Sequence, residues 1–303
     1  MKPEWLKIHR PAGKTIQTYY SVQHTIQKKK LNTVCEEAKC PNLNECWSSG
    51  TATFMLMGDT CTRGCRFCSI KTAEKPAPLN PKEPQNLVES ISNLKLNYVV
   101  LTSVDRDDLS DFGAEHFKKC VLAVKKSFRE IKVELLIPDF NGNTNCLQKI
   151  IESRAEVIGH NIETVKRLQG KVRDRRANYK QSLAVLDFIK KNSDAFTKSS
   201  LMLGLGETDK EILQTMDDLR KIDVDFLTLG QYLQPTKKQL EVIEFIHPEK
   251  FNYYAEKAKE KGFLYVASGP FVRSSYKAGE LFVKNILERK NENRNCFGKA
   301  EKI

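Results

Sequence analysis

Three cysteines within eight residues, Cys61, Cys65 and Cys68, are the sequence feature that most constrains this chain. Their C-x3-C-x2-C spacing lets three thiolates on one tight turn hold three corners of an iron–sulfur cube, whereas ordinary electron-transfer clusters use four cysteines. The fourth iron is then open to a small molecule, as is the open position of a catalytic zinc site. Gly64 lets the turn close without a Cβ clash, and Phe67 shields one side of the metal.

A second cysteine triplet, Cys35, Cys40 and Cys46, lies before the first and has C-x4-C-x5-C spacing. Pro41 ends any helix that begins near residue 36, so these thiols can converge on one side of a loop. Water, substrate or a distant residue would have to fill the fourth ligand position. Neither triplet contains the histidine that common zinc modules pair with cysteine. We therefore favour iron–sulfur sites over a zinc knuckle or incidental cysteines.

The other cysteines and the N-terminus indicate the redox compartment. The chain has nine cysteines, an odd number, and its first residues lack the apolar stretch of a secretory signal. Only 34 residues precede Cys35, which leaves little room for a transit peptide. We expect a cytoplasmic protein in which clustered cysteines bind metal, and we interpret Cys120, Cys146 and Cys296 as packing or incidental residues. No apolar run is long enough to span a bilayer, so no membrane association is expected.

The net charge of +12 is partly concentrated at the two ends of the chain. Residues 1–34 carry seven Lys or Arg against one Glu, and residues 277–303 carry seven against four. This excess either serves solubility or attracts an acidic partner, a protein or a nucleic acid. Because aromatic residues interleaved with basic ones on a repeat are absent, a nucleic-acid partner is not expected.

The order of the apolar segments predicts alternating strands and helices. Buried strands are expected at residues 53–57, 98–101, 133–137, 156–159, 199–205, 225–229 and 263–266, with amphipathic helices between them. Such alternation indicates a parallel sheet, and about six strand–helix units predict an α/β fold, a partial (β/α)6 TIM-type barrel. The barrel would comprise residues 51–267. Residues 1–50 would form an N-terminal extension with the second triplet, and residues 268–303 a C-terminal extension.

Polar residues follow several of the predicted strands, at the edge where barrels of this type carry their chemistry. They are Thr102, Ser103, Asp105, Asn161, Glu163, Gly204, Gly206, Gln231 and Tyr232. Several of these residue types are also common in turns, so each one alone is weak evidence of a site. Their shared position beside the cysteine loop predicts one joint site.

Together these features resemble the lipoyl synthases, a family of radical S-adenosylmethionine (SAM) enzymes. The similarity extends over nearly the whole chain and includes both triplets, the terminal Arg273-Ser274-Ser275-Tyr276 and the stretches 102–109, 137–140, 160–165, 204–208 and 230–236. The C-x3-C-x2-C motif alone is typical of the whole radical SAM superfamily. Both triplets together with the Arg-Ser-Ser-Tyr end are specific to this family, and the expected barrel is then of the radical SAM kind.

The resemblance implies two [4Fe–4S] clusters and SAM, the radical source, as cofactors. Cys61, Cys65 and Cys68 would hold the cluster whose open iron binds SAM. Cys35, Cys40 and Cys46 would hold an auxiliary cluster, with Ser275 as its fourth ligand. Cofactor-binding residues would be Phe67, Thr102, Ser103, Asp105, Asn161, Glu163, Gly204, Gly206, Gln231 and Tyr232, and no catalytic residue is expected beyond the cluster ligands.

The activity implied by the resemblance is insertion of two sulfur atoms at C6 and C8 of a protein-bound octanoyl-lysine, with sulfur supplied by the auxiliary cluster. The implied partners are an acidic octanoylated lipoyl carrier domain, an electron donor such as a flavodoxin or ferredoxin, and a cluster-assembly or carrier protein. One stretch, Asp174-Arg175-Arg176, differs from a Val-Arg-Pro-Gly-Ala pattern of the family, although Arg173 and Tyr179 are at their places.

Two alternatives stay open on the sequence. The first is another sulfur-inserting or methylthiolating radical SAM enzyme, which would not be expected to share the spacing of the second triplet or the terminal serines. The other is a zinc-containing, basic nucleic-acid-binding protein, which the net charge fits but the missing histidines do not.

Overall fold

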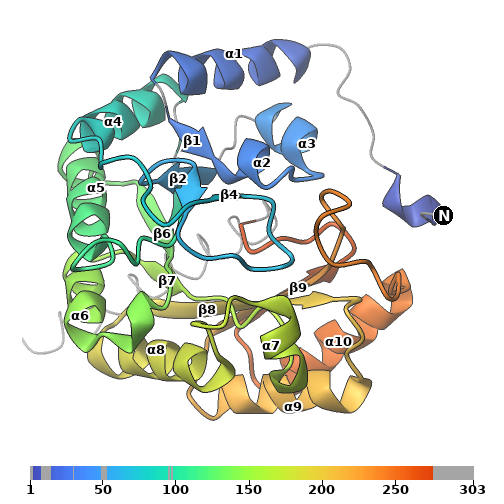
Figure 1. Ribbon diagram of the computed structural model, residues 1–303. Coiled ribbons are helices and arrows are strands. Elements are labelled where there is room, and N and C mark those ends of the chain that lie inside the picture. Colours follow the sequence, from blue (N-terminus) through green and yellow to red (C-terminus); the bar gives the residue numbers. More distant parts are fainter. Residues whose placement is uncertain are drawn as a thin grey trace, which may run out of the picture.

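The computed structural model describes residues 3–7, 15–29, 31–48, 53–94, 96 and 98–275, and its centre is one eight-stranded sheet (Figure 1). The strands lie in the order β1-β2-β5-β6-β7-β8-β9-β10. Their bounds are Asn32–Thr33 (β1), Thr53–Leu56 (β2), Tyr98–Ser103 (β5), Lys132–Leu136 (β6), Val157–Gly159 (β7), Phe196–Leu203 (β8), Phe226–Gln231 (β9) and Tyr265–Gly269 (β10). All neighbours from β2 to β10 pair in parallel, and only β1 is antiparallel to its neighbour.

A layer of helices covers the outer face of this sheet (Figure 1). These helices are α4 (Glu83–Leu94), α5 (Ala114–Ser127), α6 (Thr144–Glu152), α8 (Tyr179–Asn192), α9 (Asp209–Arg220) and α10 (Pro248–Glu260). Each follows a strand of the parallel series, so the predicted partial barrel of six strand–helix units is confirmed. Thr208 and Glu211 form the capping box at the start of α9, which satisfies backbone donors of its first turn.

The described part of the segment before the barrel includes the α-helices α1 (Thr15–Lys28), α2 (Val34–Glu37) and α3 (Leu43–Ser48). The sequence predicted an N-terminal extension here and did not predict the helix over residues 15–28. Val22 and Ile26, one helical turn apart, are both about 1% exposed, and Tyr19 packs against Trp47 of α3 with ring centroids 5.3 Å apart. These few apolar residues on one face anchor α1 to the core.

Short elements complete the chain, and several lie beside the cysteine loop. Strands β3 (Thr60–Cys61) and β4 (Lys71–Thr72) pair in parallel and bring the two ends of that loop together. The remaining elements are the 3-10 turns at Glu4–Leu6, Phe140–Gly142 and Lys166–Leu168 and the helix α7 (Gln169–Val172). None of these short elements has a periodic apolar pattern long enough to be predicted.

All seven predicted strands differ from the observed ones by one to three residues at one end or both, and two of these differences have a local structural reason. β8 ends at Leu203 because Gly204 turns the backbone into the left-handed region, at φ +102°. β10 begins at Tyr265 rather than at residue 263, since Phe263 packs in the core before the strand starts. Cys120 and Cys146 are buried in the helical layer, as their interpretation as packing residues requires, and Cys296 lies outside the described residues.

The predicted division at residues 51 and 268 stays a prediction, although β1 of the N-terminal segment joins the sheet of the barrel. Among the residues that the structure describes, no helix is long and apolar enough to cross a membrane.

Candidate functional site

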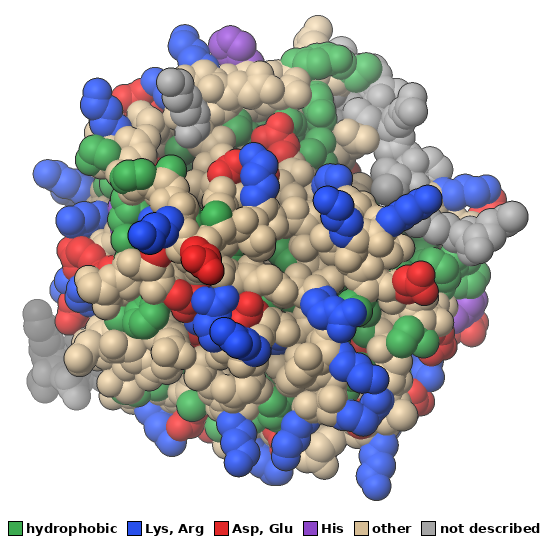
Figure 2. Space-filling model, in the orientation of Figure 1, with side chains coloured by type: hydrophobic (Ala, Val, Ile, Leu, Met, Phe, Trp, Pro, Cys, Tyr) green, Lys and Arg blue, Asp and Glu red, His purple; other side chains and the backbone are tan. Residues whose placement is uncertain are grey.

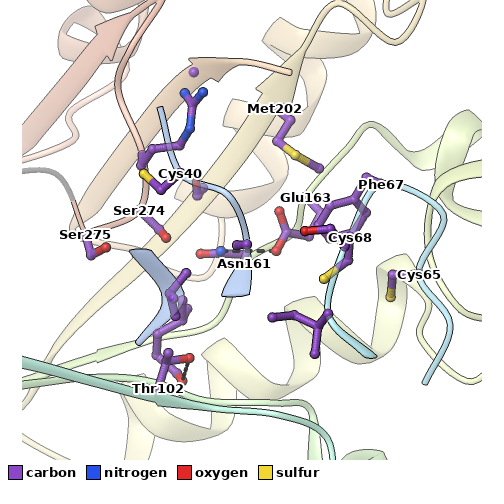
Figure 3. Close-up of a pocket in the computed structure, with 18 of the residues that line it drawn as sticks. Cys40, Cys65, Phe67, Cys68, Thr102, Asn161, Glu163, Met202, Ser274 and Ser275 are labelled. Atoms are coloured by element: carbon purple, nitrogen blue, oxygen red, sulfur yellow. Dashed lines mark hydrogen bonds between the residues drawn. The ribbon is translucent and has the colours of Figure 1, made fainter. Parts of the chain in front are cut away.

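A cavity of about 510 Å³ opens at the carboxyl ends of the parallel strands. Most of the predicted site residues line it: Cys35, Cys40, Cys61, Cys65, Cys68, Phe67, Thr102, Ser103, Asp105, Asn161, Glu163, Gln231, Tyr232 and Ser275. Cys46, Gly204 and Gly206 are not among its lining residues. In Figure 3, Cys40, Ser274 and Ser275 lie on one side of the cavity, and Cys65, Phe67 and Cys68 lie on the other.

The loop from Cys61 to Cys68, here called the cluster loop, is held by backbone hydrogen bonds to the segment that follows β5 and within the loop itself. Its first turn is tied to the end of β5 by Thr62 N–H donating to the Asp105 carbonyl at 3.0 Å. Cys68 N–H donates to the Cys65 carbonyl at 3.0 Å, which closes the last turn. The loop is thereby held at the edge where the strands end.

Backbone amides lie beside the sulfurs of the cluster loop. Arg63 N–H and Asp105 N–H lie 3.3 and 3.4 Å from Cys61 Sγ, and Asp174 N–H lies 3.3 Å from Cys65 Sγ. Burial, together with the nearby charge of Asp105, raises the pKa of Cys61 and of Cys65 to about 12. Thiols with so high a pKa stay protonated until a strongly bound cation displaces their protons. The backbone amides then stabilise the resulting thiolates.

The second triplet occupies α2, α3 and the turn between them. Burial raises the pKa of the Cys35 thiol to about 11, and burial also raises that of Cys40. Asn42 in this turn donates from Nδ2 to the Phe271 carbonyl at 2.6 Å, although 229 residues separate the two in sequence. The C-terminal stretch that contains Ser274 and Ser275 is therefore joined directly to the turn that contains Cys40.

The polar wall of the cavity includes a carboxylate held in an unusual backbone conformation. Glu163 has φ +65°, in the left-handed region that non-glycine residues seldom adopt, and its Oε1 accepts from Asn161 Nδ2 at 3.1 Å. Burial raises the pKa of Glu163, and burial also raises that of Asp105, to about 6. The Ser103 hydroxyl is buried without a hydrogen-bond partner among the described residues. An orphaned buried hydroxyl in a cavity that two carboxyl groups also line fits a polar ligand.

Four of the predicted cofactor-binding residues are engaged within the protein. Thr102 Oγ1 donates to the Leu136 carbonyl at 2.9 Å, and the Tyr232 hydroxyl donates to the Leu240 carbonyl at 2.7 Å. Gln231 donates from Nε2 to the carbonyls of residues 203, 232 and 244 and accepts from the amide of residue 246. A Cβ on Gly204 would lie 2.3 Å from Gln231 Nε2, so Gly204 makes room for that amide.

Sequence reasoning missed a charged network behind the cluster loop. Arg63 is 4% exposed, donates to Asp107 from Nε and Nη2 at 3.0 and 2.8 Å, and donates to Asp139 from Nη1 at 2.8 Å. Arg173 and His160, both buried, line the cavity and meet at the Ser182 hydroxyl. The sequence signal for Arg63 is its place between two cysteines, and Asp139 and His160 each follow a predicted strand and lie in stretches that resemble the family.

Comparisons with known proteins agree with this geometry. The model of the radical SAM superfamily matches residues 55–219. The chain is 55% identical to the mitochondrial lipoyl synthase of Drosophila melanogaster, over 97% of this chain and 78% of that one. It is also 55% identical to the lipoyl synthase of Halobacterium salinarum, over 94% and 92%, and to the apicoplast lipoyl synthase of Plasmodium vivax, of which it spans only 65%.

Solved structures show the same fold at low sequence identity. The FeFe-hydrogenase maturase HydG from Carboxydothermus hydrogenoformans superposes with a TM-score of 0.57 at 11% identity, over 90% of this chain and 84% of that one. Methylornithine synthase superposes with a TM-score of 0.53 at 12% identity, over 74% and 72%. The partial barrel is therefore of the radical SAM kind, as the sequence predicted.

Proposed function

The chain belongs to the lipoyl synthase family of radical SAM enzymes, and on this premise we propose that it inserts two sulfur atoms at C6 and C8 of a protein-bound octanoyl-lysine. Membership makes it a radical SAM enzyme and implies SAM and a [4Fe–4S] cluster. The observation that carries the proposal is that one cavity is lined by cysteines of both triplets and by Ser275.

The donor set fits two clusters rather than one. Cys61, Cys65 and Cys68 would hold the first cluster, which leaves one iron for SAM. Cys35, Cys40 and Cys46 would hold the second cluster, with Ser275 as its fourth ligand. When bound, SAM and the clusters would supply a 5′-deoxyadenosyl radical and the inserted sulfur. Histidine is absent from both sets, which fits iron–sulfur chemistry better than zinc.

The side chains of the cavity would bind and orient SAM and the octanoyl chain and would exclude water. Glu163, fixed by Asn161, offers a carboxylate to a hydroxyl or ammonium group of SAM, and the unpaired Ser103 hydroxyl offers a second polar contact. Phe67 and Met202 line the cavity and present apolar surface to the octanoyl chain. This apolar part of the cavity lining would help to keep water away from a carbon radical.

We also propose that an acidic carrier domain delivers the octanoyl group. Basic side chains are prominent on the face in Figure 2. Lys39 at the cavity, Arg66 on the cluster loop, and Lys237 and Lys238 are all exposed. The Leu240 amide donates to the Arg66 carbonyl at 3.0 Å, so these lysines stand next to the cluster loop. Complementary charge would speed association with the carrier rather than the chemistry.

Salt dependence tests the carrier proposal. Raising salt should lower the rate of turnover on the carrier domain and change turnover of a short octanoyl-lysine peptide much less, because screening weakens only the long-range attraction. The double variant Lys237→Gln/Lys238→Gln should mimic high salt with the carrier and leave the peptide rate alone. Equal salt sensitivity for both substrates would show that the basic side chains serve only solubility.

An electron donor such as a flavodoxin or ferredoxin, and a cluster-assembly or carrier protein, complete the proposed partners. The cytoplasmic location stays a prediction, because relatives named as mitochondrial and apicoplast enzymes match as well as the archaeal one.

Ser275 provides the test of the proposed function. A serine oxygen is a harder ligand than cysteine sulfur and leaves iron more readily. We expect Ser275→Cys to keep its iron and to continue cleaving SAM, while the yield of lipoyl product falls sharply. Ser274→Ala should have a much smaller effect. The assay is mass spectrometry of the octanoyl-lysine product beside a 5′-deoxyadenosine assay, and a normal lipoyl yield from Ser275→Cys would refute the role given to Ser275.

A further inference from the structure

The segment from Val172 to Arg176, here called the strap, lies against the cluster loop although more than a hundred residues separate the two in sequence. Helix α7 ends at Val172, whose carbonyl accepts from Arg66 N–H at 2.9 Å. Arg66 Nη1 reaches the Lys171 carbonyl at 3.4 Å. The strap therefore begins as a backbone contact with the C-terminal half of the cluster loop.

Asp174 contacts the centre of the cluster loop through its side chain and its backbone. Its Oδ2 accepts from Gly64 N–H at 2.8 Å, and its own N–H lies 3.3 Å from Cys65 Sγ. One residue thus fixes the amide before a proposed iron ligand and hydrogen-bonds the ligand sulfur itself. Hydrogen bonds to ligand sulfurs are one of the terms that set the potential of an iron–sulfur cluster.

Arg176 contacts the first half of the cluster loop and holds Asp174 in place. Its Nη2 donates to the Thr62 carbonyl at 2.7 Å, and its Nε donates to Asp174 Oδ1 at 2.8 Å. Its Nη1 also lies 3.4 Å from a carboxylate oxygen of Asp107, which accepts from the Thr62 hydroxyl at 2.7 Å. Arg176 therefore links the strap, the loop backbone and the charged network behind the loop.

The cluster loop needs such support because it has little regular structure of its own. Gly64 is exposed, and its amide finds its partner in Asp174 rather than within the loop. The three buried thiols keep their protons until a cation displaces them, so the metal-free loop has no ligand bonds that fix its conformation. Outside contacts that hold the ligating conformation beforehand reduce the cost of binding.

We propose that the strap preorganises the cluster loop, with Asp174 and Arg176 as positioning residues for the cluster that Cys61, Cys65 and Cys68 would hold. The inference rests on the proposed function for the identity of the bound group. It assigns a role to the charged stretch 174–176, which the sequence left without one. Arg175 is exposed and takes no part in the contacts above, so it provides a matched control of equal charge.

The test compares the cluster-loaded variants Asp174→Ala, Arg176→Ala and Arg175→Ala with the unaltered chain under anaerobic conditions. A ferrous chelator should remove the iron held by Cys61, Cys65 and Cys68 roughly tenfold faster from Asp174→Ala than from the unaltered chain. This is the effect expected for the loss of a charge-assisted hydrogen bond. Arg176→Ala should give a smaller acceleration, Arg176→Lys should recover part of it, and Arg175→Ala should match the unaltered chain. The iron held by Cys35, Cys40 and Cys46 should be released at the same rate from all variants.

Two further measurements separate positioning from general destabilisation. Hydrogen exchange should rise in the peptide that spans residues 61–68 in Asp174→Ala and stay unchanged in peptides from α9 and α10. The reduction potential of the cluster on the cluster loop, followed by its electron paramagnetic resonance signal, should also shift, while that of the other cluster stays constant. If Asp174→Ala does not accumulate as folded protein, Asp174→Asn and Arg176→Ala provide the same readouts.

The outcomes distinguish a failure of the proposal for the strap from a failure of the proposed function on which that proposal rests. The proposal for the strap would be refuted if the unaltered chain binds normal clusters and Asp174→Ala matches it in iron release, hydrogen exchange and reduction potential. Absence of iron–sulfur absorption from the unaltered chain after reconstitution would instead overturn the proposed function. Faster loss from both sites together would also refute the strap, because it would mean that the variant loosens the whole barrel.

Discussion

Replacing Arg63 should be the most damaging single change beside the cavity, because three carboxylates converge on its buried guanidinium. Besides its hydrogen bonds to Asp107 and Asp139, its Nε lies 3.3 Å from Asp105 Oδ1. Burial by itself would raise the pKa of Asp139 and of Asp107, but the hydrogen bonds from Arg63 hold both below the usual range. The Arg63→Met variant keeps an apolar stem of similar length and removes the charge.

The expected loss follows from what each carboxylate retains. Removing one partner of a buried ion pair costs about 3–5 kcal/mol, so Arg63→Met should lower the free energy of unfolding by about 4 kcal/mol. Asp107 would keep the Thr62 hydroxyl and the Arg176 guanidinium. Asp139, with a side chain only 1% exposed, would keep its turn contact with Asn141 N–H but would lose the guanidinium that neutralises its charge.

Second-site variants therefore discriminate between the two carboxylates. Asp139→Asn in the Arg63→Met background should restore about 2 kcal/mol, since it removes the buried charge that has lost its cation. Asp107→Asn in that background should restore less than about 1 kcal/mol, since this carboxylate is still paired. Arg66→Met, on the same loop but exposed, should cost less than about 0.5 kcal/mol.

The assay is urea unfolding of the full chain under anaerobic, reducing conditions, followed by circular dichroism. It is run with iron removed, so that cluster loss does not contribute to the transition. Equal rescue by Asp107→Asn and Asp139→Asn, or a cost of Arg63→Met no greater than that of Arg66→Met, would refute the reasoning.

Three further outcomes are expected. Burial, together with the charge of Arg173, lowers the pKa of His160 from its usual 6.5 to about 4. Its folded pKa is depressed, so the stability that neutral His160 contributes is present above pH 6.5 and is lost as pH falls toward 4. The total loss is about 3 kcal/mol, and it should be absent from urea titrations of His160→Gln. Gly230→Ala would place a Cβ 2.1 Å from the Val272 carbonyl oxygen and should cost about 1–3 kcal/mol, with faster proteolysis after residue 270 as the measurement. Cys65→Ala should keep the iron of the second triplet and yield no 5′-deoxyadenosine above background, which an assay of SAM cleavage checks directly.

The parts of the fold that could be predicted are those where one periodic pattern spans a whole element. The strands around residues 98 and 226 and the capping box at Thr208 are of this kind, because burial on both faces and a local hydrogen-bond pattern both appear in the sequence. Helix α1 was missed because most of its surface is polar and its anchoring depends on α3 and α4. β1 has two residues, too few for any pattern.

The candidate site divides in the same way. Cysteine spacing is local information, so the sequence alone is enough to recognise the two triplets. The Arg63 network and the strap could not be recognised in this way, because Asp107, Asp139 and Asp174 lie 44, 76 and 110 residues from their partners on the cluster loop. Gln231 was expected at a cofactor, yet its amide serves four backbone groups of the chain, a role that depends on the path of the loop up to residue 246.

The open sheet has a consequence for the entropy of the whole chain. Asn42, beyond β1 at one edge, and Phe271, beyond β10 at the other, meet across a separation of 229 residues. A group bound to Cys40 and Ser275 would close a loop of nearly the same length, and such a cross-link removes about 5 kcal/mol of conformational freedom from the unfolded chain. The bound group would then cross-link the two edges of the open sheet for as long as it is present. If the proposed sulfur insertion consumes that group, the unfolded chain would regain this freedom, and the loaded and spent protein would then differ in global stability as well as in reactivity.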